Sequence, residues 1–186
     1  MSRVLSVCPG CGLALPSPDG AMDPQYNASW ACRQLCGEVA AYTLALGDAE
    51  FLHQLVVDAY MAQHVGPNVK PIGSAFALIG LLLTFERGYS GRQVQRAHMQ
   101  LANRSKVWPR YEPLAKALLT VQDVVQSAPG SGAQARSTGV WAAGSRLPPG
   151  DARNVMIREW GKSVWDSWRP EHANVRALVD SRLYTG

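Results

Sequence analysis

Four cysteines are concentrated near the amino end of the chain, and their spacing is typical of a metal site. Cys8 and Cys11 form a C-x2-C pair within CPGCG, Cys32 and Cys36 form a C-x3-C pair within WACRQLCG, and no cysteine follows. Two close pairs of soft ligands, separated by a stretch that can fold back, suit tetrahedral Zn²⁺. The sequence therefore predicts a zinc ion bound by Cys8, Cys11, Cys32 and Cys36.

Disulfide bonds are the alternative use of four cysteines. The first residues, MSRVLSVCPGCG, contain no apolar stretch of the kind found in secretory signals, so we expect a cytoplasmic protein with reduced thiols. The turn-forming Pro9-Gly10 also lets the first two sulfurs face one point. The second pair falls in a predicted helix instead of a turn, so Cys36 is the weakest of the four ligands. His53 is the alternative fourth ligand.

The four histidines of the chain offer a second kind of chemistry. His53 and His64 fall on one stripe of a predicted helix, and His98 and His172 each lie on a helix face that also carries apolar residues. If facing helices bring these rings together, His64, His98 and His172 can form an active site around a metal. Nearby groups that can take part are Asp58 and Tyr60. Isolated histidines on apolar faces are more often structural, so this enzyme hypothesis remains the alternative.

Helical periods dominate the rest of the chain, and no strand alternation stands out, so we predict an all-α helical bundle. Expected helices cover residues 30–46 (capped by Ser29), 48–64 (capped by Asp48), 75–87 (capped by Ser74 and ended by Gly88), 92–103, 121–127, and two from 151 to 183. Residues 113–119 are expected to form a helix or turns, and the Pro- and Gly-rich residues 13–29 a loop.

Length and composition favour a single domain. The 186 residues, 47% of them hydrophobic, are enough for one full-sized core. Within residues 1–186 we expect a zinc-binding segment (1–36), a helical core (48–126), a flexible loop (127–150) and a C-terminal helical pair (151–186). An aromatic stripe of Ile157, Trp160, Val164, Trp165 and Trp168 is expected to pack in the core.

The nature of the partner is less defined by the sequence. The apolar run at residues 76–85 is about half the length needed to cross a bilayer, so no membrane contact is expected. Residues 87–116 contain seven basic side chains against one acidic, interleaved with Tyr89, Trp108 and Tyr111, which is a weak nucleic-acid-binding pattern. Because the net charge is only +4 and no known motif is present, we do not expect nucleic acid as the main partner.

Several motifs together resemble a bacterial family known only as a domain of unknown function. They are CPGCGLALP, a tyrosine in the following loop (Tyr26), a cysteine on the next helix, HQLVVDAYMAQH, and the terminal WGKSVWDSWRPEH. The resemblance covers most of the chain. It implies that Cys8, Cys11 and Cys32 are the firmer ligands, with His53 or Cys36 as the fourth, and it implies no activity.

The prediction from sequence is therefore a zinc-binding helical protein whose metal is structural. We expect a binding or accessory role, with a protein or small molecule as partner. The alternatives are the histidine-based enzyme and the weak nucleic-acid binder.

Overall fold

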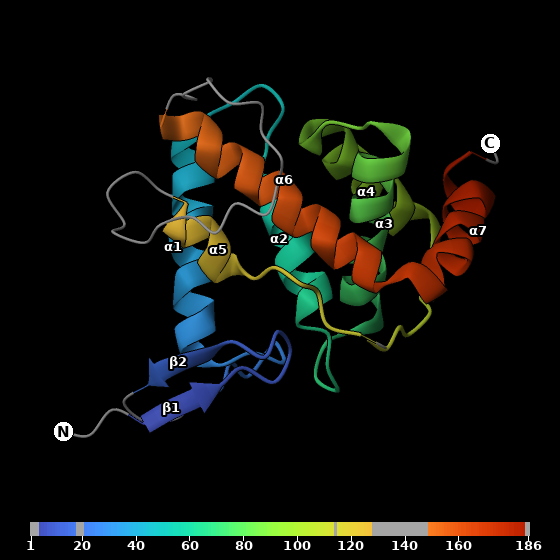
Figure 1. The fold of residues 1–186 in the computed structure, drawn as a ribbon. Coiled ribbons are helices and arrows are strands. Elements are labelled where there is room, and N and C mark those ends of the chain that lie inside the picture. Colours follow the sequence, from blue (N-terminus) through green and yellow to red (C-terminus); the bar gives the residue numbers. More distant parts are fainter. Residues whose placement is uncertain (1–3, 18–20, 114, 128–148, 185–186) are drawn as a thin grey trace.

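The computed structural model describes residues 4–17, 21–113, 115–127 and 149–184. These residues form a mostly helical body with a small hairpin at one end of α1 (Figure 1), so the all-α prediction is confirmed. In chain order the elements are β1 (Val4–Val7), β2 (Ala14–Ser17), α1 (Trp30–Leu46), α2 (His53–Gln63), α3 (Pro71–Arg87), α4 (Gly91–Arg104), α5 (Val121–Gln126), α6 (Pro149–Ser167), the 3₁₀ helix η1 (Arg169–Glu171) and α7 (His172–Leu183). Most of the predicted flexible loop 127–150 lies outside the described residues.

The hairpin was not predicted from the sequence. β1 and β2 pair antiparallel, with Leu5 opposite Pro16 and Val7 opposite Ala14, and the metal-loop motif CPGCG connects them. Each strand has only four residues, and Leu5 and Val7 are 66% and 60% exposed. Because apolar side chains of the hairpin face solvent, its sequence lacks the alternation of buried apolar and exposed polar residues that indicates a strand. The segment therefore looks like a loop when only the sequence is considered.

Helix α1 has the predicted bounds and cap. Ser29 is extended, and its hydroxyl accepts a hydrogen bond from the amide of Cys32. The helix ends where Gly47 adopts a left-handed conformation, with φ of 57°. The capping residue therefore fixes Cys32 in the first turn of the helix.

Two predicted helix starts were wrong. The carboxylate of Asp48 accepts from the Leu52 amide, but Phe51 has φ of 56°, so residues 48–52 form a separate turn and α2 begins at His53. α3 begins at Pro71, earlier than predicted, because proline suits the first turn of a helix. Ser74 is inside α3, where its hydroxyl donates to the Pro71 carbonyl.

The later helices agree better with the predictions. Gly88 ends α3 with φ of 67°, and Ser90 caps α4 through a reciprocal capping box with Gln93. Residues 113 and 115–119 are not helical. Residues 115–119 are irregular and are held by Ser163, whose hydroxyl accepts from the amides of Leu118 and Leu119.

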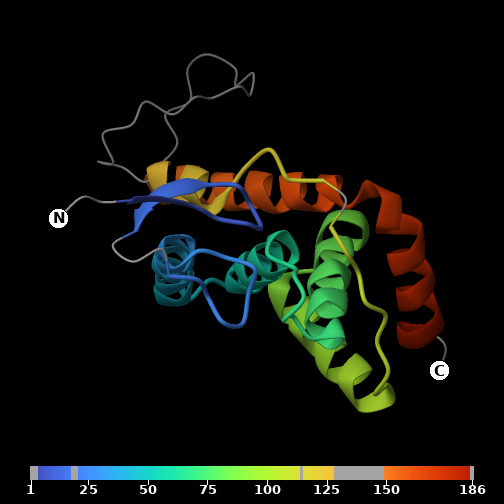
Figure 2. The same cartoon turned by 90° about the horizontal axis from the view of Figure 1, so that it is seen from below.

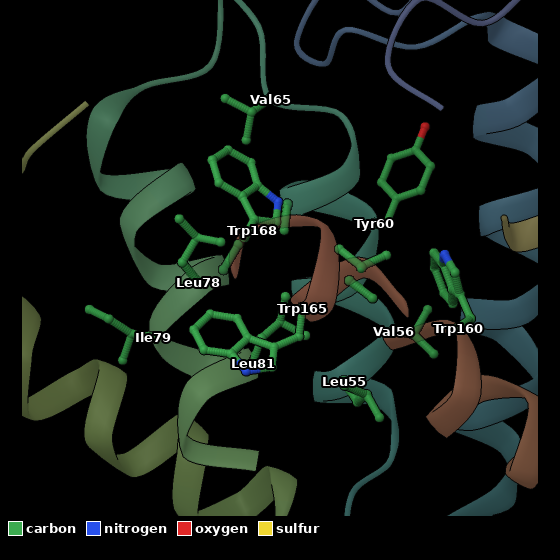
Figure 3. Packing of buried hydrophobic residues seen from close by; sticks show 14 of the residues in the cluster. Leu55, Val56, Tyr60, Val65, Leu78, Ile79, Leu81, Trp160, Trp165 and Trp168 are labelled. Carbon is green, nitrogen blue, oxygen red and sulfur yellow. The ribbon is translucent and has the colours of Figure 1, made fainter. Parts of the chain in front are cut away.

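The core forms where α6 crosses α2 and α3, as Figures 1 and 2 show. All five residues of the predicted aromatic stripe are buried, and Figure 3 shows Trp160, Trp165 and Trp168 among side chains of α2 and α3. Gly161 allows this approach, because a Cβ there would lie 2.8 Å from Leu55 of α2 and 3.2 Å from Phe85 of α3. After α6, Pro170 lies in η1, and α7 starts at His172.

Within the described part of the chain, no helix is both long enough and apolar enough to cross a bilayer.

Candidate metal centre

Three of the predicted cysteine ligands lie close to a histidine, at the end of the helical body that carries the hairpin. The ligand atoms of Cys8, Cys11, Cys32 and His64 all lie within 4.8 Å of one another. Cys8, Cys32 and His64 are fully buried, and Cys11 is 7% exposed. The four side chains come from the hairpin loop, the start of α1 and the end of α2, so this cluster joins three separate segments.

The hairpin loop presents the first two sulfurs through its backbone. The Gly12 amide donates to the Cys8 carbonyl over 2.7 Å, and the Cys8 amide donates to the Leu13 carbonyl over 2.8 Å. Gly12 has φ of 80°, a conformation that side chains other than glycine rarely adopt. The second glycine of CPGCG is therefore required by the turn.

Gly10 is required for a different reason, which is the close approach of another segment. Its amide donates to the Asn27 carbonyl over 2.9 Å. A Cβ at this position would lie 2.6 Å from that carbonyl oxygen, 2.7 Å from Cδ2 of His64 and 2.9 Å from the Gln63 carbonyl oxygen. Only glycine lets the loop lie against the imidazole ligand.

Cys32 and His64 are held by their helix ends. Cys32 is in the first turn of α1, where its amide donates to the hydroxyl of the capping residue Ser29. His64 follows the last residue of α2, and its Nδ1 lies 2.7 Å from the Tyr60 carbonyl oxygen. Because only a protonated Nδ1 can donate to that carbonyl, Nε2 is left as the metal-binding nitrogen, the usual second-shell arrangement for histidine ligands.

Two distances within the cluster match those expected around a tetrahedral ion. The sulfurs of Cys11 and Cys32 are 3.8 Å apart, and Cys32 Sγ is 3.4 Å from His64 Nε2. Bonds of about 2.3 Å to sulfur and about 2.0 Å to nitrogen, set at tetrahedral angles, give separations of about 3.8 and about 3.5 Å. A disulfide requires sulfurs about 2.05 Å apart, and all four cysteines are free.

The thiols and the imidazole of the cluster shift one another's pKa values. Hydrogen bonds from Cys11, then Cys32, lower the pKa of Cys8 far below its ordinary value, whereas hydrogen bonds with Cys11 and Cys8 raise the pKa of Cys32. Burial lowers the pKa of His64, but the nearby side chains of Cys11 and Cys8 outweigh it and raise the pKa to about 9. A cation bound at this cluster would favour the thiolate form of its cysteines.

The predicted fourth ligand was Cys36, with His53 as the alternative. Both residues lie outside this cluster. Cys36 is one helical turn beyond Cys32 and buried, and burial raises the pKa of its thiol to about 12. His53 Nδ1 lies 3.0 Å from the Thr43 hydroxyl, at the far end of α2 from His64. The position expected for one of these two residues is taken by His64.

The proposed histidine active site is not assembled in the described residues. No cluster of three or more metal-ligating side chains there includes His98 or His172. His98 stacks on Phe76, with ring centroids 4.7 Å apart, and burial lowers its pKa to about 4. His172 stacks on Trp165, and its Nε2 is 2.9 Å from the Trp165 carbonyl oxygen. Each ring is fixed by its own local contacts.

The two other catalytic candidates are also in packed surroundings. Asp58 is buried against α3, where its Oδ1 accepts from Gln54 and its Oδ2 would lie 2.0 Å from a Cβ at Gly80. The ring of Tyr60 lies 4.1 Å from the ring of His64 (centroid distance), so Tyr60 forms part of the wall of the metal centre.

The basic stretch 87–116 makes mostly internal contacts. Arg87 pairs with Asp180, and four others donate to backbone carbonyls: Arg92 to Ala49, Arg104 to Arg182, Lys106 to Ala102 and Arg110 to Val69. These basic side chains already have partners within the protein and are less available to bind the phosphates of a nucleic acid. Nucleic-acid binding by this stretch stays an untested alternative.

Fold and site together define a helical protein with a Cys₃His cluster suited to a metal ion. The chain belongs to a family of unknown function (DUF5946), which matches residues 6–169 and so includes all four ligand positions. The resemblance to an uncharacterised family is thereby confirmed. No curated protein and no solved structure matches the chain.

Proposed function

We propose that the chain holds one Zn²⁺ at Cys8, Cys11, Cys32 and His64, and that this zinc is structural. The observation that carries the proposal is the convergence of four ligand atoms within 4.8 Å of one another in a buried site. Three thiolates and one imidazole suit zinc, and four protein ligands complete a tetrahedral sphere without a place for water or substrate. Such a site acts on folding and not on a reaction.

The role of the zinc is to tie the hairpin to the helical body. Among the elements of the described chain, the hairpin makes its most extensive contacts outside itself with α1, through β2. The metal adds links from the hairpin loop to α1 and to the end of α2, and structural zinc contributes on the order of 10 kcal/mol to folding. We infer that the protein is a binding or accessory protein whose N-terminal surface is shaped by this ion.

The test is a metal analysis of matched variants. The purified protein should contain one zinc per chain by elemental analysis. Cys32→Ser should lose the metal and unfold at a lower temperature, whereas Cys36→Ser, one turn away on the same buried helix face, should keep it. His64→Ala and His53→Ala form the second pair, with the same expected contrast.

Cobalt provides an independent measure of the ligand set. Co²⁺ substituted for zinc should show thiolate-to-metal charge-transfer absorption in the Cys36→Ser variant as in the unmodified protein. A protein without zinc, or a Cys36→Ser variant that loses metal as Cys32→Ser does, would contradict the proposed ligand set.

A further inference from the structure

A second site lies directly beside the metal loop. It is a cavity of about 380 Å³ between the loop, the end of α2, the irregular segment that follows α4 and the end of α6. Its lining includes Pro9, Gly10, Gln63, Lys116, Ser167 and Trp168. This volume falls within the range of small-molecule sites.

The polar side chains of this cavity fall into two groups. Both polar atoms of Gln63 have a partner, since its Nε2 donates to the Leu119 carbonyl and its Oε1 accepts from the indole of Trp160. The hydroxyl of Ser167 donates to the Val164 carbonyl. These side chains build the wall and have little left to offer a ligand.

Lys116 and Trp168 are different, because neither side chain has a hydrogen-bond or ion-pair partner among the described residues. Lys116 extends along the metal loop, with its Nζ 3.0 Å from the position of a Cβ at Gly12. Trp168 is 3% exposed, and its unpartnered indole nitrogen keeps some accessible surface. The polar residues of the lining whose side chains have no partner are thus a lysine and a tryptophan, one cation and one N–H donor.

We propose that this cavity binds a small carboxylate with an apolar body. Lys116 is the one charged side chain in the described lining, and both free groups donate, so the complementary ligand is an anion that accepts hydrogen bonds. The side chains of Pro9 and Trp168 supply apolar surface for the rest of the molecule. Neutral or cationic ligands leave Lys116 without a partner and bind more weakly.

Ligand binding is coupled to the metal, a feature that rests on the proposed zinc site. Pro9 and Gly10 form one wall of the cavity and lie between the ligands Cys8 and Cys11. Loss of the metal releases this wall, so the metal-free chain binds the carboxylate weakly. By linkage, the carboxylate raises the affinity for zinc by the same factor.

The experiment uses benzoate as the probe and benzamide as its uncharged counterpart. Each is titrated into the zinc-loaded full chain while the Trp168 indole and Gly10 amide signals are followed by NMR. Benzoate should shift both signals saturably and bind about tenfold more tightly than benzamide, as expected for one charge-assisted contact. Absence of a saturable benzoate shift, or equal affinities for the two probes, would overturn the proposal.

Two lysine variants locate the site. Lys116→Met should bind benzoate about tenfold more weakly and benzamide unchanged. Lys116 also lines the neighbouring cavity at Phe85 and Leu118, whereas Lys162 lines that cavity alone, so Lys162→Met is the control and should behave as the unmodified protein. An effect of Lys162→Met, with or without one of Lys116→Met, would assign the ligand to the neighbouring cavity and refute the proposal.

Zinc content is measured on the same samples, which separates the two proposals. A chain that lacks zinc refutes the structural metal whatever benzoate does. A chain with one zinc and no response to benzoate refutes only the carboxylate site.

Discussion

Replacing Gly10 by alanine perturbs the metal centre without touching a ligand. The added Cβ would lie 2.6 Å from the Asn27 carbonyl oxygen, 2.7 Å from Cδ2 of His64 and 2.9 Å from the Gln63 carbonyl oxygen. Two of these atoms belong to the backbone, so the loop or the end of α2 must move to relieve the contact. Either movement separates His64 from the sulfurs of Cys8 and Cys11.

The size of the effect follows from the cost of overpacking. Forcing one extra carbon into a closely packed region costs about 1–3 kcal/mol. The metal-free loop can relax, so most of this cost falls on the metal-bound state. We therefore expect Gly10→Ala to weaken zinc binding about 5- to 150-fold.

Gly37→Ala is the matched control. Gly37 is exposed in the middle of α1, and a Cβ there meets nothing within 4 Å. Alanine should stabilise the helix by about 0.5–1 kcal/mol and leave zinc affinity unchanged.

Zinc affinity is measured by competition with a chromophoric chelator, and stability by thermal unfolding of the zinc-loaded protein. If Gly10→Ala binds zinc as tightly as the unmodified chain, then the loop does not lie against His64 as described. If Gly37→Ala weakens zinc binding to the same extent, then the effect is not local to the loop.

Two further predictions concern the core. Burial raises the pKa of Asp58, so the folded protein keeps this carboxyl protonated where the unfolded chain ionises it. Its contribution to stability is complete below about pH 4 and falls as pH rises through the folded pKa, and Asp58→Asn should flatten this part of the curve of unfolding free energy against pH. If the unfolding free energy of Asp58→Asn and of the unmodified protein changes with pH to the same extent, this reasoning is wrong. Gln63→Leu leaves the buried indole N–H of Trp160 and the Leu119 carbonyl without their partner, so denaturant unfolding should show a loss of about 1–3 kcal/mol; an unchanged midpoint would show that other groups replace the amide.

Much of the helical body was predictable because its signals are local. Ser29, Gly88 and Ser90 mark helix ends through contacts within a few residues, and the aromatic stripe of α6 has a clear period. The starts of α2 and α3 were predicted wrongly because Asp48 and Ser74 are strong capping residues in the sequence. The helices instead begin after the left-handed Phe51 and at Pro71. The hairpin was missed because its strands are short and expose apolar side chains.

The metal centre was predictable only in part. Cys8, Cys11 and Cys32 were singled out by residue type and spacing. His64 was singled out for a different reason, as one of two histidines on a stripe of α2, and nothing in the spacing connected it to the cysteines. Its place depends on how the end of α2 lies against the hairpin loop, a contact made through Gly10 and Asn27 between segments distant in the chain. The missed signal was the paired glycines of CPGCG, which indicate that another segment comes close.

The candidate metal ligands are distributed in a way that bears on the order of assembly. All four lie within the first 64 residues, whereas α6, which completes the core over α2 and α3, begins at Pro149. During synthesis the full ligand set emerges from the ribosome well before the helix that closes the core. Ion capture can therefore organise the amino-terminal third early, so that α6 later docks onto a platform whose α1 and α2 ends are already joined.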